Sequence, residues 1–333
     1  MLYLGSTKIT PILKHTKYGA TIDTMLGNKD SNNILQLPTG SADISFPGIT
    51  GVAANALTYA FYKNPTVHSV SFPDLTTLST SNCMQRAFSD CPNNTTASFP
   101  NLTTLSAQNG MNYAFGNNTS LTSVNLNNLT TVSGAAVLGY AFSGCSSLTS
   151  ISFPKLTSST GSNAFNNAFS SCTSLTSASF PVLSSLSGAW GYVFSGCTSL
   201  SSVSFPELIK IGLNTSSAGS AQFANAFYNC SELTTLTFPK LEQIYCNGSS
   251  TTAGTFYNNN KIEKLYFPKL TTITYGSGTT SANQNTCKYV FSNCSSLTEF
   301  HFGEANETSI KATPGWSTLW GRGAGNATVY FDL

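Results

Sequence analysis

The chain has 333 residues, a formal net charge of +2 at pH 7, and charged residues at only 8% of its positions. Neutral hydroxyl and amide groups must therefore cover most of its polar surface, and no Lys/Arg run supplies the basic stripe that nucleic-acid binding requires. We expect no nucleic-acid partner. Because no window approaches the roughly 18 consecutive apolar residues of a membrane span, we also expect no membrane insertion.

Residues 1–43 precede the regular part of the chain. They begin without a basic region or a small-residue cleavage site, so no secretory signal peptide is expected in this numbering. Residues 3–9 resemble the short leader of some phage tail and prophage-encoded structural proteins. We expect residues 1–43 to form an N-terminal cap or an attachment segment. The expected location is extracellular or on a virion surface, with a cytoplasmic stage before particle assembly as the alternative.

An internal repeat occupies residues 44–302, as a half unit followed by nine units. Its marker phenylalanines, the first five of them 27 residues apart, are Phe61, Phe88, Phe115, Phe142, Phe169, Phe194, Phe227, Phe256 and Phe291. A second marker, a Pro that follows a Phe, keeps the same register at Pro47, Pro73, Pro100, Pro154, Pro181, Pro206, Pro239 and Pro268. Two markers in one register predict a repeat array rather than separate globular domains.

The unit at residues 140–156 shows the pattern most clearly. Its apolar residues Leu148, Ile151, Phe153 and Leu156 have the L-x-x-L-x-L-x-x spacing of a strand whose inward residues stack on the next coil. We read the preceding Ala-Phe-x-x-Cys segment as a short helical or 3₁₀ turn. The predicted fold is an α/β repeat: a right-handed leucine-rich-repeat solenoid with a parallel sheet on one face and short helical or 3₁₀ turns on the other.

These residues resemble the BspA-type leucine-rich repeats of bacterial surface antigens, whose pattern is A-F-x-x-C-x-x-L-x-x-I-x-(I/F)-P. The resemblance covers residues 44–302. Members of that family are generally adhesive or interaction proteins, so the resemblance implies a recognition role without naming a ligand. One departure from the pattern is Asn94, a polar residue at a leucine position, and we expect that coil to pack less well.

One repeat position, three residues after the marker Phe, holds either Cys or Asn. We call these residues the structural ladder: Asn64, Cys91, Asn118, Cys145, Cys172, Cys197, Cys230, Asn259 and Cys294. Cys and Asn exchange where a small side chain hydrogen-bonds a buried backbone, whereas a metal ligand or a disulfide partner would not tolerate the exchange. We therefore expect buried structural thiols, no metal and no cofactor.

The outward positions of the strands predict a binding site near the C-terminus. Small hydroxyl or amide side chains fill these positions in the first seven units, and then Lys264, Tyr266, Glu299 and His301 replace them. A ring beside charged groups can offer a ligand both a stacking surface and polar anchors. The simpler interpretation is that solvent-facing positions have drifted to larger residues, and it stays open at this stage.

Two insertions and the tail add further candidates. Gly212–Asn225 and Tyr275–Lys288 are rich in Gly, Ser, Thr and Asn, and such insertions often form a rim on the binding face of a solenoid. In the tail, Trp316, Trp320 and Arg322 could stack on a sugar or seal the last coil. We expect residues 303–333 to form a C-terminal cap that includes a last strand near residues 327–331.

The leading functional hypothesis is a non-catalytic surface-recognition protein, adhesin-like or virion receptor-binding, that contacts a cell-surface glycan or protein. The alternative is a structural or decoration component of a phage particle, which would contact neighbouring virion subunits. A glycan-active enzyme using the pair Glu263 and Glu299 ranks third. The histidines His15, His68 and His301 lie too far apart in a solenoid to form a catalytic triad.

Overall fold

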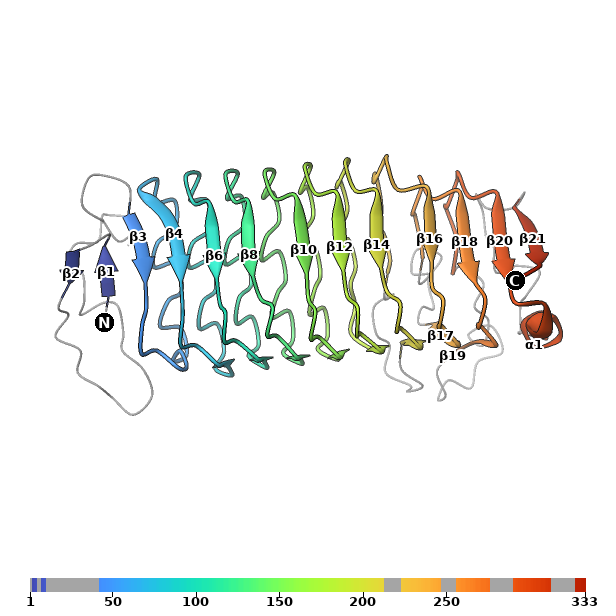
Figure 1. Cartoon of the computed structure of the whole chain (residues 1–333), viewed down its shortest axis with the longest axis horizontal. Helices are drawn as coiled ribbons and strands as arrows, with labels where there is room; N and C mark the ends of the chain where they lie inside the picture. The colour runs from blue at the N-terminus through green and yellow to red at the C-terminus, as the bar shows by residue number, and fades with distance from the viewer. Residues whose placement is uncertain are drawn as a thin grey trace.

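In a computed structural model, the described part of the chain winds into one elongated solenoid with its coils in sequence order along the long axis (Figure 1). The described residues are 2–4, 7–9, 42–212, 223–246, 256–275, 290–312 and 327–333. Each coil contributes one strand to a long sheet, a short second strand, and a run of turns. Three faces therefore surround one continuous apolar core.

The first face is the parallel sheet expected from the L-x-x-I-x-F pattern (Figure 1). Its strands are β3 Ala42–Ser45, β4 Val67–Ser71, β6 Thr96–Ser98, β8 Ser123–Asn125, β10 Ser150–Ser152, β12 Ser177–Ser179, β14 Ser202–Ser204, β16 Thr235–Thr237, β18 Lys264–Phe267, β20 Glu299–Phe302 and β21 Thr328–Phe331. Equivalent residues pair across coils, for example Ser150 with Ser177 and Ser177 with Ser202. A register shift between Ala42 and Asp43 interrupts the pairing of β3 with β4, and the ladder is broken between β8 and β10 and between β14 and β16 among the described strands. Because the other paired strands keep one register, their outward side chains form columns.

The two ends of this sheet are closed in different ways. At the N-terminal end, β1 (Leu2–Leu4) and β2 (Thr7–Ile9) form an antiparallel pair, and β1 also runs antiparallel to β3. At the C-terminal end, the expected last strand is present as β21 and pairs in parallel with β20. A 3₁₀ turn, η2 (Glu304–Asn306), and the helix α1 (Glu307–Lys311) connect to this end, with Ile310 buried.

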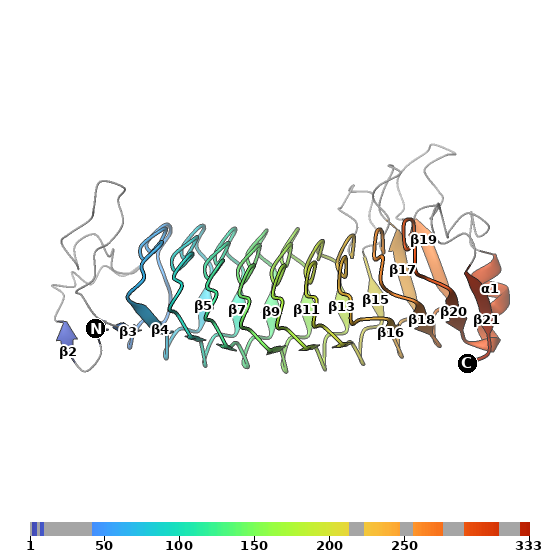
Figure 2. The same cartoon turned by 90° about the horizontal axis from the view of Figure 1, so that it is seen from above.

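The second face is a ladder of very short parallel strands, which Figure 2 shows along another side of the solenoid. They are β5 Thr77–Leu78, β7 Thr104–Leu105, β9 Thr131–Val132, β11 Ser158–Ser159, β13 Ser185–Leu186, β15 Lys210–Ile211, β17 Gln243–Cys246 and β19 Thr272–Tyr275. In the first strands of this ladder an outward Thr precedes a buried apolar residue, as in Thr104 and Leu105. Each two-residue strand of this ladder thus turns its second side chain inward, as Leu78 and Ile211 show.

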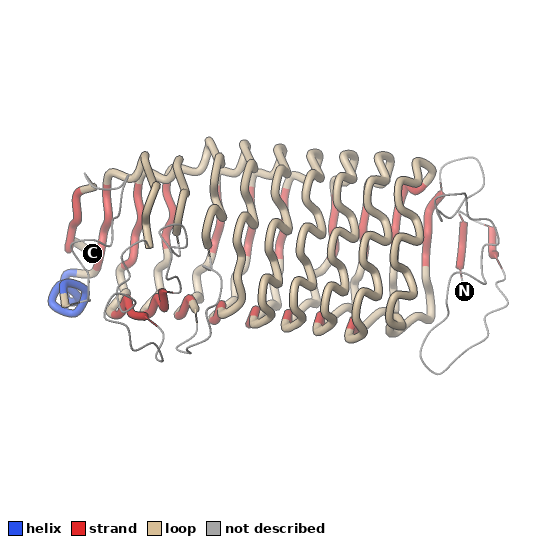
Figure 3. Tube along the Cα trace, turned by 180° about the vertical axis from the view of Figure 1, so that it is seen from behind, coloured by secondary structure: helices blue, strands red, loops and turns tan. Residues whose placement is uncertain are grey.

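The third face differs from the sequence-based expectation of helical or 3₁₀ turns. Successive turns occupy it (Figure 3), and a residue of left-handed φ recurs every fourth position, as at Asn109, Tyr113 and Asn117. These reversals divide the backbone N–H groups between two partners. Ala114 donates within its own coil to Met111, while Tyr113 and Phe115 donate to carbonyls of the next coil. A helix would keep all these bonds inside one coil, so this face would contribute no backbone hydrogen bonds between coils.

Two phenylalanine ladders fill the core. One consists of marker phenylalanines such as Phe115, Phe142 and Phe169, stacked in parallel at centroid distances of 5.7 and 5.5 Å. The other consists of the residues before the marker prolines, such as Phe153 and Phe180, stacked at 5.2 Å. Stacking at the coil spacing buries apolar surface that no single coil could bury alone, which explains why both markers recur.

Candidate binding site

Strands β18 and β20 bring the four predicted site residues together on the outward side of the sheet. Lys264 pairs in register with Glu299, and Tyr266 pairs with His301. The alternating residues Leu265 and Phe300 point into the core. Strand alternation therefore explains why these four residues share one surface.

Two further residues belong to the same surface and extend it to the end of the chain. Tyr330 on β21 is the register partner of His301, and Asp332 follows that strand directly. We call the six residues together the C-terminal patch: Lys264, Tyr266, Glu299, His301, Tyr330 and Asp332. Continuing the repeat register into residues 327–331 would have revealed Tyr330 from the sequence, because its strand was expected there.

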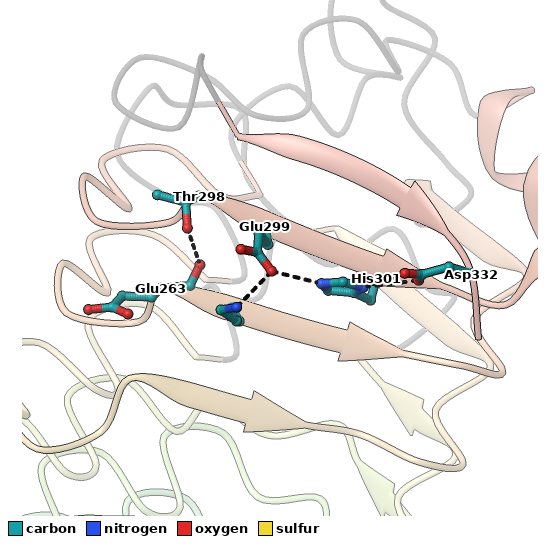
Figure 4. Close-up of polar contacts among 6 residues, drawn as sticks. Glu263, Thr298, Glu299, His301 and Asp332 are labelled. Carbon is teal, nitrogen blue, oxygen red and sulfur yellow. Dashed lines mark hydrogen bonds and ion pairs between the residues drawn. The ribbon is translucent and has the colours of Figure 1, made fainter.

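The charges of the C-terminal patch are paired with one another (Figure 4). The Glu299 carboxylate lies 2.9 Å from Lys264 Nζ and 3.0 Å from His301 Nε2, and His301 Nδ1 lies 2.9 Å from Asp332 Oδ1. Both ring nitrogens thus face carboxylates, which only accept hydrogen bonds when ionised. A protonated imidazole can donate to both, whereas a neutral imidazole can donate to only one.

This pairing shifts the titration of two groups. The hydrogen bond from Lys264, and after it that from His301, lowers the pKa of Glu299 below its ordinary value. The same bond to Glu299 raises the pKa of Lys264. Both charged forms are therefore favoured near neutral pH, and the surface holds a compact network rather than separate charges.

Three rings stack across the same strands. The Tyr266 and His301 rings lie 4.6 Å apart, the His301 and Tyr330 rings lie 4.7 Å apart, and each pair is inclined by 12°. The His301 side chain is only 12% exposed, while Tyr330 is 38% exposed. The outer ring is thus the one most open to a partner, and the histidine between the tyrosines is held rigidly.

The carboxylates of Glu263 and Glu299, the pair considered from the sequence, are not directed toward one another (Figure 4). The Glu263 side chain extends away from Glu299, and its backbone oxygen accepts a hydrogen bond from Thr298 Oγ1 at 3.3 Å (Figure 4). Elsewhere in the described chain, His68 lies 3.0 Å from Asp43 and far along the solenoid from His301. No cluster of three or more His, Cys, Asp or Glu that could hold a metal ion occurs among the described residues.

Every residue of the structural ladder is buried. In each ladder cysteine the thiol donates to the carbonyl of a marker Phe one coil back, as from Cys145 to Phe115 at 3.2 Å and from Cys294 to Phe256 at 3.0 Å. Burial raises the pKa of Cys145 to about 12, so the thiol stays protonated and unreactive. At Asn259 the amide accepts from Phe227 N and donates to Phe256 O instead.

Asn94 is the polar departure from the repeat pattern at a leucine position. Its side chain is fully buried at a position where other coils hold leucine, and neither its amide oxygen nor its amide nitrogen has a hydrogen-bond partner. A buried polar group without a partner costs about 1–3 kcal/mol. The site is enclosed by the core, so it offers nothing to a ligand.

Several other candidates lie outside the described residues. These are most of the two insertions, the tail residues Trp316, Trp320 and Arg322, and His15. Among the residues that the structure does describe, no helix is long and apolar enough to cross a membrane. The candidate surface therefore rests on the C-terminal patch.

Comparison with known proteins identifies the repeat. Residues 55–167, 112–219, 166–278 and 223–313 match the family model described as the BspA type leucine-rich repeat region. No curated protein matches the chain in sequence.

Similar solved structures include leucine-rich repeat proteins of bacteria. One from T. pallidum is 20% identical, with a TM-score of 0.37, over 66% of this chain and 90% of that chain. One from Bacteroides ovatus is 15% identical, with a TM-score of 0.23, over 90% and 97%. The pneumococcal vaccine antigen PcpA is 13% identical, with a TM-score of 0.23, over 92% and 82%.

Proposed function

The chain belongs to the BspA-type leucine-rich repeat family, and from that premise we propose that it is a non-catalytic recognition protein whose C-terminal patch contacts a cell-surface glycan or protein. Families of this repeat type typically serve as binding scaffolds without enzymatic activity. The observation that carries the proposal is the contrast along the sheet. From β4 to β16 the outward columns hold small hydroxyl or amide side chains, and β18 begins a surface with three stacked rings, one lysine and two carboxylates.

Preorganisation supports recognition at this surface. The ion pairs and ring stacking hold Lys264, Tyr266 and Tyr330 in fixed positions, so a partner would not have to order them on binding. Immobilising a side chain costs about 0.5–1.5 kcal/mol, and a network that is already fixed avoids that cost. The hydroxyl and amide columns from β6 to β16 present neither a ring nor a charged group.

The test exchanges side chains that the repeat already tolerates. In Lys264→Thr/Tyr266→Thr, strand β18 receives the outward residues of β16, which are Thr235 and Thr237. The matched control is Thr235→Ser/Thr237→Ser on β16 itself. Binding to immobilised cell-surface preparations and to a glycan array is measured for variants that melt at similar temperatures.

We expect the β18 variant to lose binding about tenfold or more, because it loses a ring contact and a charge together, and the β16 variant to bind like the parent. Equal loss in both variants would place the contact outside the patch. No binding by the parent to any surface would contradict a recognition role and favour a structural component of a particle.

A further inference from the structure

A second column of large side chains lies on the turn face, two residues before each marker Phe. In the first four units it holds Tyr59, Arg86, Tyr113 and Tyr140, with left-handed φ values of 56°, 53°, 55° and 54°. This backbone region disfavours bulky side chains at a cost on the order of 1 kcal/mol or more. The sequence interpretation did not find this column, although its constant offset from the marker Phe is a readable signal.

The turn itself does not require these residues. Units five and seven hold Asn167 and Asn225 at the same position, with φ values of 56° and 55°. Asn tolerates the left-handed region far better than Tyr or Arg, because its short polar side chain can bond the local backbone. The first four units therefore carry tyrosine or arginine at a strained backbone position where asparagine would fit with less strain.

The side chains of this column form one stack. The Arg86 guanidinium carbon lies 4.0 Å from the Tyr113 ring centroid and 5.8 Å from that of Tyr59. On its other side Tyr113 stacks on Tyr140 at 4.3 Å and 3°. A guanidinium between two rings gains cation–π attraction from both, which restricts the motion of the Arg86 side chain.

Tyr62 and Lys63 extend the stack at its N-terminal end. The Tyr62 ring meets Tyr59 edge to face at 5.5 Å, and Lys63 Nζ lies 5.1 Å from the Tyr62 ring centroid. Tyr59 is 43% exposed, which leaves ring surface available for a partner. We call these residues the turn-face column: Tyr59, Tyr62, Lys63, Arg86, Tyr113 and Tyr140.

The cations of the turn-face column have no carboxylate partner in the described part of the chain. Arg86 and Lys63 contact only rings through their charged groups. The carboxylate on the same run of turns, Asp90, is already engaged, since it accepts from Ser89 Oγ and from Asn117 Nδ2 at 2.8 and 2.9 Å. The N–H groups on the guanidinium edge are therefore available to an external acceptor.

We propose that the turn-face column binds a carboxylated sugar of the hexuronate class, with the carboxylate paired to the Arg86 guanidinium and the sugar ring against Tyr59. A planar guanidinium matches a carboxylate through two parallel hydrogen bonds. An exposed tyrosine supplies a flat apolar surface and a hydroxyl, and the partly exposed amides of Gln85 and Asn112 adjoin the column in sequence. Neutral amides and phenols suit a ligand rich in hydroxyl groups.

This site lies on another face and in other coils than the C-terminal patch, so it stands whether or not that patch binds a partner. The probe is a tetramer of β-linked glucuronate, and the comparison ligand is the neutral glucose tetramer of the same linkage. Isothermal titration of the full chain measures both. We expect the acidic tetramer to bind about tenfold or more tightly than the neutral one, because only it supplies the charge-assisted pair.

Three variants test the assignment. Arg86→Gln should weaken binding of the acidic tetramer about tenfold or more, and Tyr113→Asn should weaken it several-fold, because the guanidinium loses its support. The matched control is Tyr192→Asn, which makes the same exchange at the same repeat position in a coil flanked by Asn167 and Asn225. It should bind like the parent. All variants are compared at equal folded fraction by circular dichroism.

The proposal is overturned by equal binding of the acidic and neutral tetramers, by an unchanged affinity in Arg86→Gln, or by no binding of the acidic tetramer to the parent. Binding of a tetraglutamate peptide as tight as that of the acidic sugar tetramer also overturns it. The column would then recognise negative charge alone, and the partner would be an acidic protein segment. Arg86→Lys separates charge from geometry. It should retain only part of the affinity, since an ammonium cannot form the bidentate pair.

Discussion

The C-terminal patch and the turn-face column are built alike but differ in how their charges are partnered. Both stack aromatic side chains at the spacing of the coils and place cations among the rings. In the patch, Lys264 and His301 each face a carboxylate. In the column, Arg86 and Lys63 lie over rings and form no ion pair within the described part of the chain.

One repeat scaffold thus produces two kinds of surface, one with its charges paired and one whose cations lie over rings. An anion that approached the patch would have to displace Glu299 or Asp332, so the patch is better suited to a partner recognised through rings and hydroxyl groups. An anion at the column would displace no carboxylate of the described chain. Unpaired polar groups are therefore available for recognition when exposed, and they cost stability when buried.

The largest effect is expected where a polar group is unpaired inside the core. Asn94→Leu should raise the free energy of unfolding by about 1–3 kcal/mol, because an amide without partners gives way to the residue that equivalent coils hold. Denaturant unfolding checks it. The matched control is Asn259→Leu, which should destabilise, since the Asn259 amide pairs with Phe227 N and Phe256 O. If both variants changed the free energy of unfolding in the same direction, pairing of the buried amide would not explain the difference between the two sites.

The next effect concerns the pairing of the C-terminal patch. Glu299→Gln should lower the melting temperature, because Lys264 and His301 lose the carboxylate between them. Thermal unfolding followed by circular dichroism measures the change. The control is Glu207→Gln, which removes an isolated exposed ion pair with Lys240 and should change stability little. A patch whose charges were unimportant to the fold would show no difference between the two variants.

A smaller change in folding stability is expected at acidic pH. The pKa of Glu299 is lowered in the folded chain, so its contribution to stability is present above its ordinary value near 4.5 and is lost as the pH falls below that value. The hydrogen bond from Ser69, and after it that from His68, likewise lowers the pKa of Asp43. The loss of stability between pH 5 and pH 3 should therefore be smaller in Glu299→Gln than in the parent, without disappearing. An unchanged acid profile would contradict the pairing.

The smallest effect should appear at Tyr192, which occupies the same repeat position as Tyr113 but lies outside the turn-face column. Tyr192 has a left-handed φ of 56° and no ring partner among the described residues, so Tyr192→Asn should leave stability within about 0.5 kcal/mol of the parent or raise it slightly. Tyr113→Asn relieves the same strain but loses contacts with Arg86 and Tyr140, so it should be the less stable of the two. Calorimetric melting compares them. The reverse order would mean that stacking does not offset the strain.

Repetition in the sequence was sufficient to predict the solenoid, because every coil presents the same apolar spacing to its neighbours. The alignment of Phe142 with Phe169 and of Cys145 with Cys172 anticipated which residues stack in adjacent coils. The outward placement of Lys264 and Glu299 likewise followed from strand alternation. A regular period shows which side chains point inward and which point outward, since a register shift of one residue would expose the apolar side chains to solvent.

Which polar groups pair, and with what, was decided only by the tertiary structure. The sequence suggested Glu263 and Glu299 as a pair of carboxylates, but Glu299 instead forms ion pairs with Lys264 and His301. Which residues pair depends on side-chain positions across neighbouring coils. The expected helical turn is a run of left-handed reversals for a related reason: hydrogen bonds to the next coil outweigh local helix formation. Short-range patterns thus determine which face of a coil a residue occupies. Contacts between residues about 30 positions apart determine whether the polar group of that residue already has a partner within the chain or is available to a ligand.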